Sequence, residues 1–281
     1  LGQGLANSTR LHPDAVARSL EIVRGFRTIL DTHELERVGC VATQALREAE
    51  NRDDFIVPAE EILGCPIELI AGEREATLVS RAVFESFPKL CEGKTLTVDV
   101  GGASTEFVLS ENSSVQWVRS LPIGAVKLTE AALQSDPPTV AEVGQLMEAI
   151  DAAIGELPLP SDVKVIGSAG TATTIASIAL ELAGYEPERI HGHTLSADSV
   201  REILESLLRQ SVAERKAVIG LEERRADVIA AGIAIYSRVL TRTNADDFTI
   251  GNRGLRWGLA YEVAGQSTTT QKSAAQKSAG E

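Results

Sequence analysis

The sequence predicts an α/β fold, and three observations support this prediction. Amphipathic helical patterns alternate with short apolar strands along the chain, which is typical of helices packed on a sheet. Two of the strands run directly into loops that are rich in glycine and hydroxyl residues. The length of 281 residues, with 43% hydrophobic and 24% charged residues, is sufficient for two globular domains.

The first part of the chain is expected to alternate between helices and short strands. Pro13 suits the first turn of a helix that runs to about His33, because apolar residues recur at three- and four-residue spacing. The elements expected after it are a strand over 38–43, a helical turn over 44–50, a helix over 53–63, a strand over 67–70 and a helix over 73–85.

The pattern changes after a predicted hinge over residues 89–94. Three β-rich runs follow, and later strands lead into longer helices. We expect strands over 96–100, 106–110, 115–121, 163–166 and 247–250, and helices over 123–133, 140–154, 173–182, 196–209, 222–240 and the second half of 253–264. The low-complexity residues 265–281 are predicted to form a disordered tail.

The stretch over residues 96–110 reads LTVDVGGASTEFVLS and is the strongest candidate site. Gly101 and Gly102 allow a tight turn and a close approach to a ligand. Asp99 ends the incoming strand and Glu106 opens the returning one. Amides in such a turn can bind an anion, and Mg²⁺ prefers one or two carboxylates beside phosphate and water oxygens. The alternative is an ordinary hairpin whose polar residues only shape the turn.

A second stretch, over residues 163–174, reads VKVIGSAGTATT and joins a strand, a glycine loop and a helix N-terminus. This combination can bind an anion or a nucleotide, although a plain strand–helix junction has the same pattern. Glu75 also follows a strand end, in the first turn of a helix, where α/β proteins place ligand-binding groups. Complementarity to the helix dipole is the alternative explanation for Glu75.

Composition and charge exclude several classes of protein. The formal net charge of −13 and the lack of a basic stripe argue against a nucleic-acid partner. Three cysteines without CxxC spacing argue against a disulfide framework or a zinc site, and favour a reducing cytoplasm. No apolar run has the roughly 18 residues of a membrane span, so no membrane partner is expected. His191 and His193 flank Gly192 and are interpreted as surface-loop residues rather than metal ligands.

Seven motifs then point to one family. In chain order they read ATQALREA, AGEREATL, DVGGASTE, LPIGAVKLTE, GSAGTATT, ERRADVIAAG and GLRWGLAYE. This ordered set resembles the exopolyphosphatase / guanosine pentaphosphate phosphatase (Ppx/GppA) family, in its short form. The resemblance extends from Leu1 to about Ala264, which is nearly the whole chain.

The resemblance implies two actin-like (ribonuclease H-like, ASKHA superfold) α/β domains with an active-site cleft between them. The first domain is expected over residues 1–88 together with a C-terminal helix at 254–264, and the second over 89–253. The implied reaction is Mg²⁺-dependent hydrolysis that releases terminal orthophosphate from inorganic polyphosphate, with Mn²⁺ as a substitute metal. A homodimer is a further possibility by analogy.

The resemblance also assigns roles to residues. Glu75 matches the family's catalytic glutamate, with the expected role of general base, and Arg47 matches an arginine that faces the phosphates. Asp99 and Glu106 match the acidic pair that holds Mg²⁺. The two phosphate loops are represented by Gly101, Gly102, Ala103 and Ser104, and by Gly167, Ser168, Ala169, Gly170 and Thr171.

Three departures from the family pattern carry expectations of their own. Arg74 replaces the first glutamate of the usual pair, and its charge is expected to lower the pKa of Glu75 or to help bind phosphate. Ala103 replaces a glycine, which requires only a backbone conformation that tolerates a Cβ. The chain opens at LGQGL, which in the family follows a first hairpin and phosphate loop, so that hairpin is expected to be missing and the first domain incomplete.

Several functions share this pattern. The close alternative is a pppGpp 5′-phosphohydrolase that converts pppGpp to ppGpp with the same machinery. A non-catalytic sensor that binds polyphosphate or (p)ppGpp is a second alternative, favoured by the missing hairpin. A sugar or acetate kinase of the same superfold is disfavoured, because Glu75 and the GLRWGLAYE motif match the phosphatase branch.

We predict that Glu75→Gln lowers the rate of orthophosphate release by a factor of about 10² to 10⁴ and leaves substrate binding largely intact. A positioned general base contributes an acceleration of this size, whereas its removal leaves the phosphate-binding groups in place. Single-turnover kinetics together with a binding isotherm measure the two effects separately. Retained turnover in the variant would remove Glu75 from the mechanism.

Overall fold

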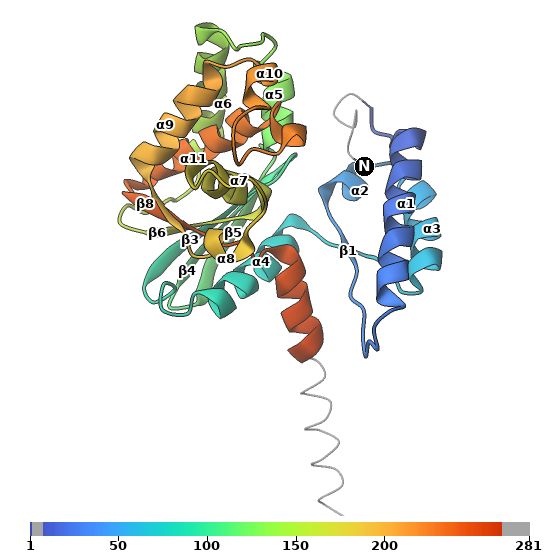
Figure 1. Cartoon of the computed structure of the whole chain (residues 1–281). Coiled ribbons are helices and arrows are strands. Elements are labelled where there is room, and N and C mark those ends of the chain that lie inside the picture. The colour runs from blue at the N-terminus through green and yellow to red at the C-terminus, as the bar shows by residue number, and fades with distance from the viewer. Residues whose placement is uncertain (2–7, 266–281) are drawn as a thin grey trace, which may run out of the picture. The chain divides into compact units, whose positions relative to one another are not determined.

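The computed structural model describes Leu1 and residues 8–265, so the predicted tail lies outside the described residues. The chain divides into two compact units, which we call unit 1 and unit 2 (Figure 1). Unit 1 consists of two segments of the chain, the first ending at Glu75 and the second beginning at Trp257. Unit 2 is the segment between them, Ala76–Arg256. The boundary falls inside helix α4 (Gly72–Ser86), earlier in the chain than the expected residue 88.

Unit 1 packs helices around a small parallel sheet. Its two strands pair with Val41 opposite Glu68, and both strands are shorter than the sequence predicts. The apolar core of this unit includes Val23, Leu46 and Ala59. Its elements are α1 (Pro13–Leu30), β1 (Val41–Ala42), α2 (Gln44–Glu48), α3 (Asp53–Leu63), β2 (Glu68–Leu69), the start of α4, and a helix over residues 255–265.

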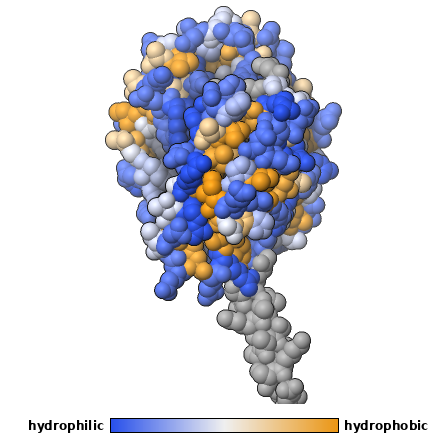
Figure 2. Space-filling view, turned by 90° about the vertical axis from the view of Figure 1, so that its right-hand side faces the viewer, coloured by the Kyte–Doolittle hydropathy of each residue, from blue (hydrophilic) through white to orange (hydrophobic). Residues whose placement is uncertain are grey.

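Helix α1 begins as the sequence predicts, with Pro13 in its first turn. The ring nitrogen Nδ1 of His12 accepts a hydrogen bond from the Asp14 amide and caps the helix. The buried side of α1 contains Ala15 and Val23, whereas Phe26 and Ile29 of the apolar pattern are 55% and 57% exposed. Figure 2 shows apolar side chains gathered on the face of the molecule that carries α1 and α3.

Unit 2 is built on a six-stranded sheet with the order β5-β4-β3-β6-β8-β7. The three central strands β3, β6 and β8 are parallel, and the strands on either side of them are antiparallel. The strands are β3 (Lys94–Val100), β4 (Thr105–Glu111), β5 (Ser114–Leu121), β6 (Lys164–Ser168), β7 (Thr194–Ser196) and β8 (Asp247–Ile250).

The two faces of this sheet have different coverings. Leu96, Val98 and Val100 of β3 point into the main core, which is formed with helices of unit 2 (Figure 1). Side chains alternate along a strand, so Asp99 lies on the opposite face, where Val83 of α4 packs against Ile166. The remaining helices are α5 (Ala125–Ala132), α6 (Val140–Gly155), α7 (Ala169–Ala179), α8 (Pro187–Ile190), α9 (Ala197–Leu208), α10 (Val212–Arg215) and α11 (Ile229–Thr243).

Three short elements and the start of α11 differ from the sequence prediction. The strand β7 and the helices α8 and α10 were not predicted, because three or four residues are too short to show a period. Helix α11 begins at Ile229 rather than residue 222, after a 3₁₀ turn at Glu223–Arg225. Among the described helices, none combines the length and the apolar character that crossing a bilayer requires.

Tyr236 on α11 joins strands β3 and β6. Its buried hydroxyl lies 2.9 Å from the carbonyl oxygen of Val98 on β3 and 3.1 Å from the carbonyl oxygen of Ser168 on β6. The two oxygens share the hydroxyl proton as a hydrogen-bond donor. Burial raises the pKa of Tyr236 and the charge of Asp99 adds to the rise, so the hydroxyl stays a donor.

We predict that Tyr236→Phe lowers the free energy of unfolding by about 1 kcal/mol, the usual net worth of one hydrogen bond. Urea denaturation followed by circular dichroism measures the change. The control is Tyr185→Phe at a ring that is 61% exposed, which should change stability by less than about 0.5 kcal/mol. Equal effects of the two substitutions would show that the Tyr236 hydroxyl contributes nothing specific.

Candidate active site

Four polar side chains form a row across the sheet of unit 2. The register places Ser120 opposite Glu106, Glu106 opposite Asp99, and Asp99 beside Ser168. Paired residues on neighbouring strands share a face, so all four side chains project from the same side of the sheet. Asp99, Glu106 and Ser168 are 9%, 3% and 0% exposed, so three of the four side chains are buried, and Ser120 is partly buried.

Two hydroxyl groups hold the carboxylate of Glu106 in place. The Oγ atoms of Ser104 and Ser120 both donate to its Oε1 at 2.7 Å. Ser104 comes from the glycine turn and Ser120 from β5, so the turn and the sheet are tied to the same oxygen. The predicted metal ligand is therefore positioned by its neighbours.

The pairing of Asp99 with Glu106 suits a divalent cation. Like charges directly opposite one another on adjacent strands repel, and a bound cation offsets this repulsion. Carboxylate oxygens are the hard donors that Mg²⁺ takes, usually one or two of them with water and phosphate oxygens. Within the described residues no cluster of three or more His, Cys, Asp or Glu side chains could hold a metal, so these two carboxylates would be the protein's share of the ligands.

The first glycine turn is held to α5 by its carbonyl groups. The carbonyls of Gly101 and Gly102 accept hydrogen bonds from the first turn of α5, at 2.9 Å from the amides of Ala125 and Val126. Gly102 and Ala103 are exposed residues, and no hydrogen bond among the described residues uses their amides. Successive amides in such a turn can bind an anion. Ala103 has a negative φ, so the substitution of the family's glycine is tolerated at this position.

Gly124 brings α5 into contact with this turn. A Cβ at Gly124 would lie 2.5 Å from the Gly102 oxygen and 2.7 Å from the Ala103 carbonyl carbon. Only glycine permits this approach of two backbones. Gly124 was not among the predicted site residues, although it lies in the LPIGAVKLTE motif.

The second loop begins α7 directly after β6. Ser168 is the N-cap of α7, and Ala169 has a φ of +62°, a left-handed conformation that costs a residue with a Cβ about 1–2 kcal/mol. The hydroxyl of Ser168 is buried at the end of the polar row and has no hydrogen-bond partner in the described structure. A ligand oxygen at the row would satisfy this hydroxyl.

Arg225 lies over the first turn of α7. A Cβ at Gly170 would be 2.4 Å and 2.5 Å from the two terminal guanidinium nitrogens of Arg225, so the glycine makes room for this cation. The helix N-terminus carries partial positive charge as well, and the two together favour an anion. The sequence analysis missed Arg225, although the ERRADVIAAG motif contains it.

Gly167 and Thr171 of the second loop make contacts with the core of unit 2. A Cβ at Gly167 would lie 2.8 Å from the Phe248 ring and 3.0 Å from the Tyr236 ring, so this glycine is a close-packed strand residue. The Thr171 hydroxyl donates to the Val100 carbonyl at 3.0 Å and joins α7 to the end of β3. In the described structure, both predicted site residues are therefore engaged in packing or hydrogen bonding within unit 2.

The predicted site residues of unit 1 lie around the end of β2. Arg47 donates from Nη1 to the Ile70 carbonyl at 2.5 Å. Glu75 is half-buried in the first turn of α4, and its amide donates to the Ala71 carbonyl at 3.0 Å. Arg47 therefore supports the segment that leads into Glu75.

Arg74 differs from its expected role beside Glu75. Its guanidinium makes a bidentate ion pair with Glu262, at 2.8 Å and 2.5 Å, and also lies 3.7 Å from Glu68. The hydrogen bond with Glu262 raises the pKa of Arg74. The charge that was expected to bind phosphate is therefore matched by carboxylates of unit 1.

A buried carboxylate pair and two glycine loops lie at one edge of the sheet, an arrangement that suits phosphate groups and a divalent cation. The chain belongs to the Ppx/GppA phosphatase family, whose model matches residues 1–267. It has the actin-like α/β fold and is a hydrolase of phosphoanhydride bonds.

Three similar proteins illustrate this relationship. The chain is 32% identical to "Exopolyphosphatase 2" of Mycobacterium tuberculosis over 278 residues, which cover 94% of this chain and 86% of that protein. A solved structure of the Aquifex aeolicus Ppx/GppA family member has a TM-score of 0.83 at 32% identity and covers 95% of this chain and 87% of its own. "Guanosine-5′-triphosphate,3′-diphosphate pyrophosphatase" of Aeromonas salmonicida is 28% identical over 95% of this chain and 53% of its own length.

We predict that Gly124→Ala weakens orthophosphate binding and lowers the free energy of unfolding by about 1–3 kcal/mol, because the added methyl forces the turn away from α5. The matched control is Gly144→Ala on α6, where an added Cβ meets no atom within 4 Å. That control should gain up to about 1 kcal/mol from better helix propensity. Isothermal titration with phosphate and urea denaturation measure the two effects, and equal behaviour of the two variants would contradict the prediction.

Proposed function

We propose that this chain is a Mg²⁺-dependent exopolyphosphatase that releases terminal orthophosphate from inorganic polyphosphate. The observation that carries this proposal is the polar row Ser120–Glu106–Asp99–Ser168, bordered by two loops suited to anions. The 32% identity to a protein named exopolyphosphatase supports the choice of substrate. A cytoplasmic location and a homodimer remain predictions.

In this proposal Asp99 and Glu106 hold Mg²⁺, and Mn²⁺ can take its place. The metal would supply positive charge that neutralises the phosphate oxygens as the bond to the terminal group breaks. Glu106 is fixed by the hydroxyls of Ser104 and Ser120, so the protein defines where the cation sits before substrate arrives.

The phosphate chain is bound by amides and by one cation of unit 2. The amides of the exposed residues Gly102 and Ala103 would receive one set of phosphate oxygens. The N-terminus of α7 at Ala169 and Gly170, with the guanidinium of Arg225, receives another. Phosphoryl transfer depends mostly on positioning and charge neutralisation, and these groups provide both.

Glu75 is the proposed general base and Arg47 a second phosphate-binding cation. The carboxylate of Glu75 takes a proton from the attacking water, whose oxygen forms the new bond to the terminal phosphorus. The bond to the bridging oxygen breaks, and the shortened chain leaves with that oxygen. These two roles rest on the family motifs and on the position of both residues at the end of β2.

The second candidate function is hydrolysis of pppGpp to ppGpp. The Aeromonas salmonicida relative has a name that contains the guanosine substrate, and the same groups would cleave its terminal phosphoanhydride. A sensor that binds these ligands without turnover is the third candidate. All three candidates require the same phosphate loops, so the substrate comparison decides between them.

The test is orthophosphate release in the presence of Mg²⁺ from long-chain polyphosphate, short-chain polyphosphate and pppGpp. We expect release from polyphosphate, and the comparison of the two chain lengths measures the preference between them. A faster reaction with pppGpp would select the second function. Tight binding of either ligand with no release would select the sensor.

We predict that Asp99→Asn raises the Mg²⁺ concentration needed for half-maximal activity by about tenfold or more, because one of two charged metal ligands becomes neutral. The control is Asp162→Asn, at an exposed residue with a φ of +61° that asparagine also tolerates. An unchanged Mg²⁺ titration in Asp99→Asn would count against a metal role for this carboxylate.

A further inference from the structure

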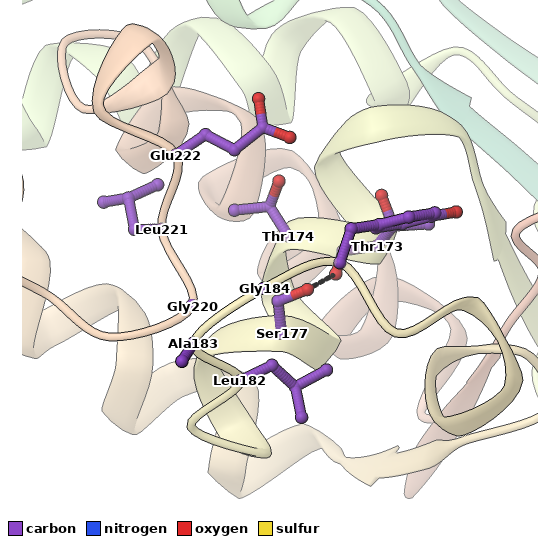
Figure 3. A pocket seen from close by; sticks show the side chains of 10 residues that line it. Thr173, Thr174, Ser177, Leu182, Ala183, Gly184, Gly220, Leu221 and Glu222 are labelled. Carbon is purple, nitrogen blue, oxygen red and sulfur yellow. Dashed lines mark hydrogen bonds between the residues drawn. The ribbon is translucent and has the colours of Figure 1, made fainter.

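Two loops of unit 2 border helix α7. The first, over residues 220–222, packs on the helix, and Figure 3 shows the pocket that this loop encloses with Thr173 and Ser177. The second, over residues 251–254, reads GNRG and follows the last strand, β8, so we call it the β8 loop. None of the predicted site residues lies in the β8 loop.

The β8 loop lies at the same edge of the sheet as the polar row. Strands β8 and β6 are parallel, with Ile250 opposite Gly167, so the loop leaves the sheet at the edge where Ser168 ends β6. The amide of Gly251 donates to the Gly167 carbonyl at 2.8 Å. A Cβ at Gly254 would lie 3.2 Å from the Oγ atom of Ser168. The loop therefore contacts the buried hydroxyl that ends the row and has no hydrogen-bond partner in the described structure.

His191, which follows α8, holds this loop in place. Its ring nitrogen Nδ1 accepts a hydrogen bond from the Asn252 amide at 3.3 Å. The side-chain amide of Asn252 donates to the Pro187 carbonyl at 2.9 Å, so one loop residue is bound at two points. The ring of His191 also stacks on Phe87, with 4.7 Å between the ring centroids and 29° between the ring planes. Stacking thus fixes the ring, and the ring fixes the loop.

Only the neutral form of His191 can make this hydrogen bond. A ring nitrogen that accepts from an amide carries no proton, so the proton of the neutral ring is on Nε2. In the cationic form both ring nitrogens are donors, and Nδ1–H would face the N–H of Asn252. The hydrogen bond to the β8 loop is therefore lost when the ring gains a proton.

The surroundings of His191 favour the neutral form. Burial lowers the pKa of His191 below its ordinary value of about 6.5, and the positive charge of Arg253 in the β8 loop lowers it further. At the start of α8, Arg189 and Glu186 form an ion pair with each other at 3.2 Å, so their charges offset. The stacked ring of Phe87 brings no charge. At neutral pH the ring is therefore neutral and the loop is held.

We propose that neutral His191 is a positioning residue of this hydrolase, which holds the β8 loop against Ser168 and releases the loop when the ring is protonated. Ser168 is the N-cap of α7 and lies beside Asp99 in the polar row, so a shift of the loop disturbs both. The inference rests on the proposed function, because it takes this edge of the sheet as the place where phosphate binds. The sequence interpretation of His191 as a surface-loop residue misses this role, because the partners of the ring are distant in the chain.

The pH dependence of orthophosphate release from polyphosphate tests the proposal. We expect kcat/KM of the unchanged chain to fall by about five- to tenfold between about pH 7.5 and about pH 5, because one hydrogen bond that holds the loop is lost. His191→Asn replaces Nδ1 by an oxygen that accepts but does not titrate, so it should keep the activity at neutral pH and remove this acid step. The matched control is His193→Asn, where the backbone carbonyl rather than the ring bonds to Ile250, and it should keep the step.

His191→Phe separates the hydrogen bond from the stacking. Phenylalanine keeps a ring against Phe87 but offers no acceptor to the Asn252 amide. We expect this variant to lower kcat/KM by about five- to tenfold at neutral pH and to show no acid step. The Mg²⁺ concentration for half-maximal activity should stay the same, because Asp99 and Glu106 lie on β3 and β4. A general loss of structure would shift the Mg²⁺ titration as well.

An NMR titration of the unchanged chain tests the state of the ring without turnover. The ¹⁵N chemical shifts of the His191 ring report which nitrogen carries the proton and at which pH the ring gains a second one. We expect the Nε2–H tautomer at neutral pH and a pKa below about 6.5. The Nδ1–H tautomer, or a pKa above this value, would overturn the inference.

Two kinetic results would also overturn it. An acid step that persists in His191→Asn would assign the step to another group, and full activity of His191→Phe would show that the loop does not depend on the ring. Failure of the proposed function is distinguishable, because the unchanged chain would then release no orthophosphate from polyphosphate or pppGpp at any pH. Tripolyphosphate binding would replace turnover as the readout in that case, with the same loss of affinity expected in His191→Phe and the same acid step in the unchanged chain.

Discussion

The site depends on the register of β3 with its two neighbours. Side chains alternate along a strand, so a slip of one residue would send Asp99 to the apolar face and leave Val98 or Val100 in its place. The main core prevents this slip, because Leu96, Val98 and Val100 fill the other face together. Buried hydroxyls add a second restraint, since Tyr236 joins Val98 to Ser168 and Thr171 joins α7 to Val100.

The sequence was sufficient to identify those candidate site residues that lie within one motif. Asp99, Glu106 and the two glycine loops are local patterns, and the register brings the two carboxylates and Ser168 into one row. Gly124 and Arg225 were missed because their importance comes from close approach to residues distant in the chain, Gly102 and Gly170. The ion pair of Arg74 was not predicted for the same reason, since its main partner is Glu262, 188 residues later.

An acidic protein that binds a polyanion has to do so with local groups. The formal net charge of −13 repels a phosphate chain at long range, and salt weakens that repulsion more than it weakens short contacts. Several arginines are also occupied by carboxylates, as Arg74 is by Glu262 and Arg238 by Asp151. In the proposed function, attraction would therefore come from the amides of the first glycine turn, from the start of α7, from a bound cation and from Arg225, which also lies 3.7 Å from Glu222.

Helix α7 presents opposite chemistry at its two ends. Its first turn offers positive charge through the amide ends and Arg225, which suits any phosphate chain. The following turns offer only acceptors, because their hydroxyl protons are given to backbone carbonyls. The first turn of α7 therefore suits a phosphate group, whereas the following turns suit groups that donate hydrogen bonds.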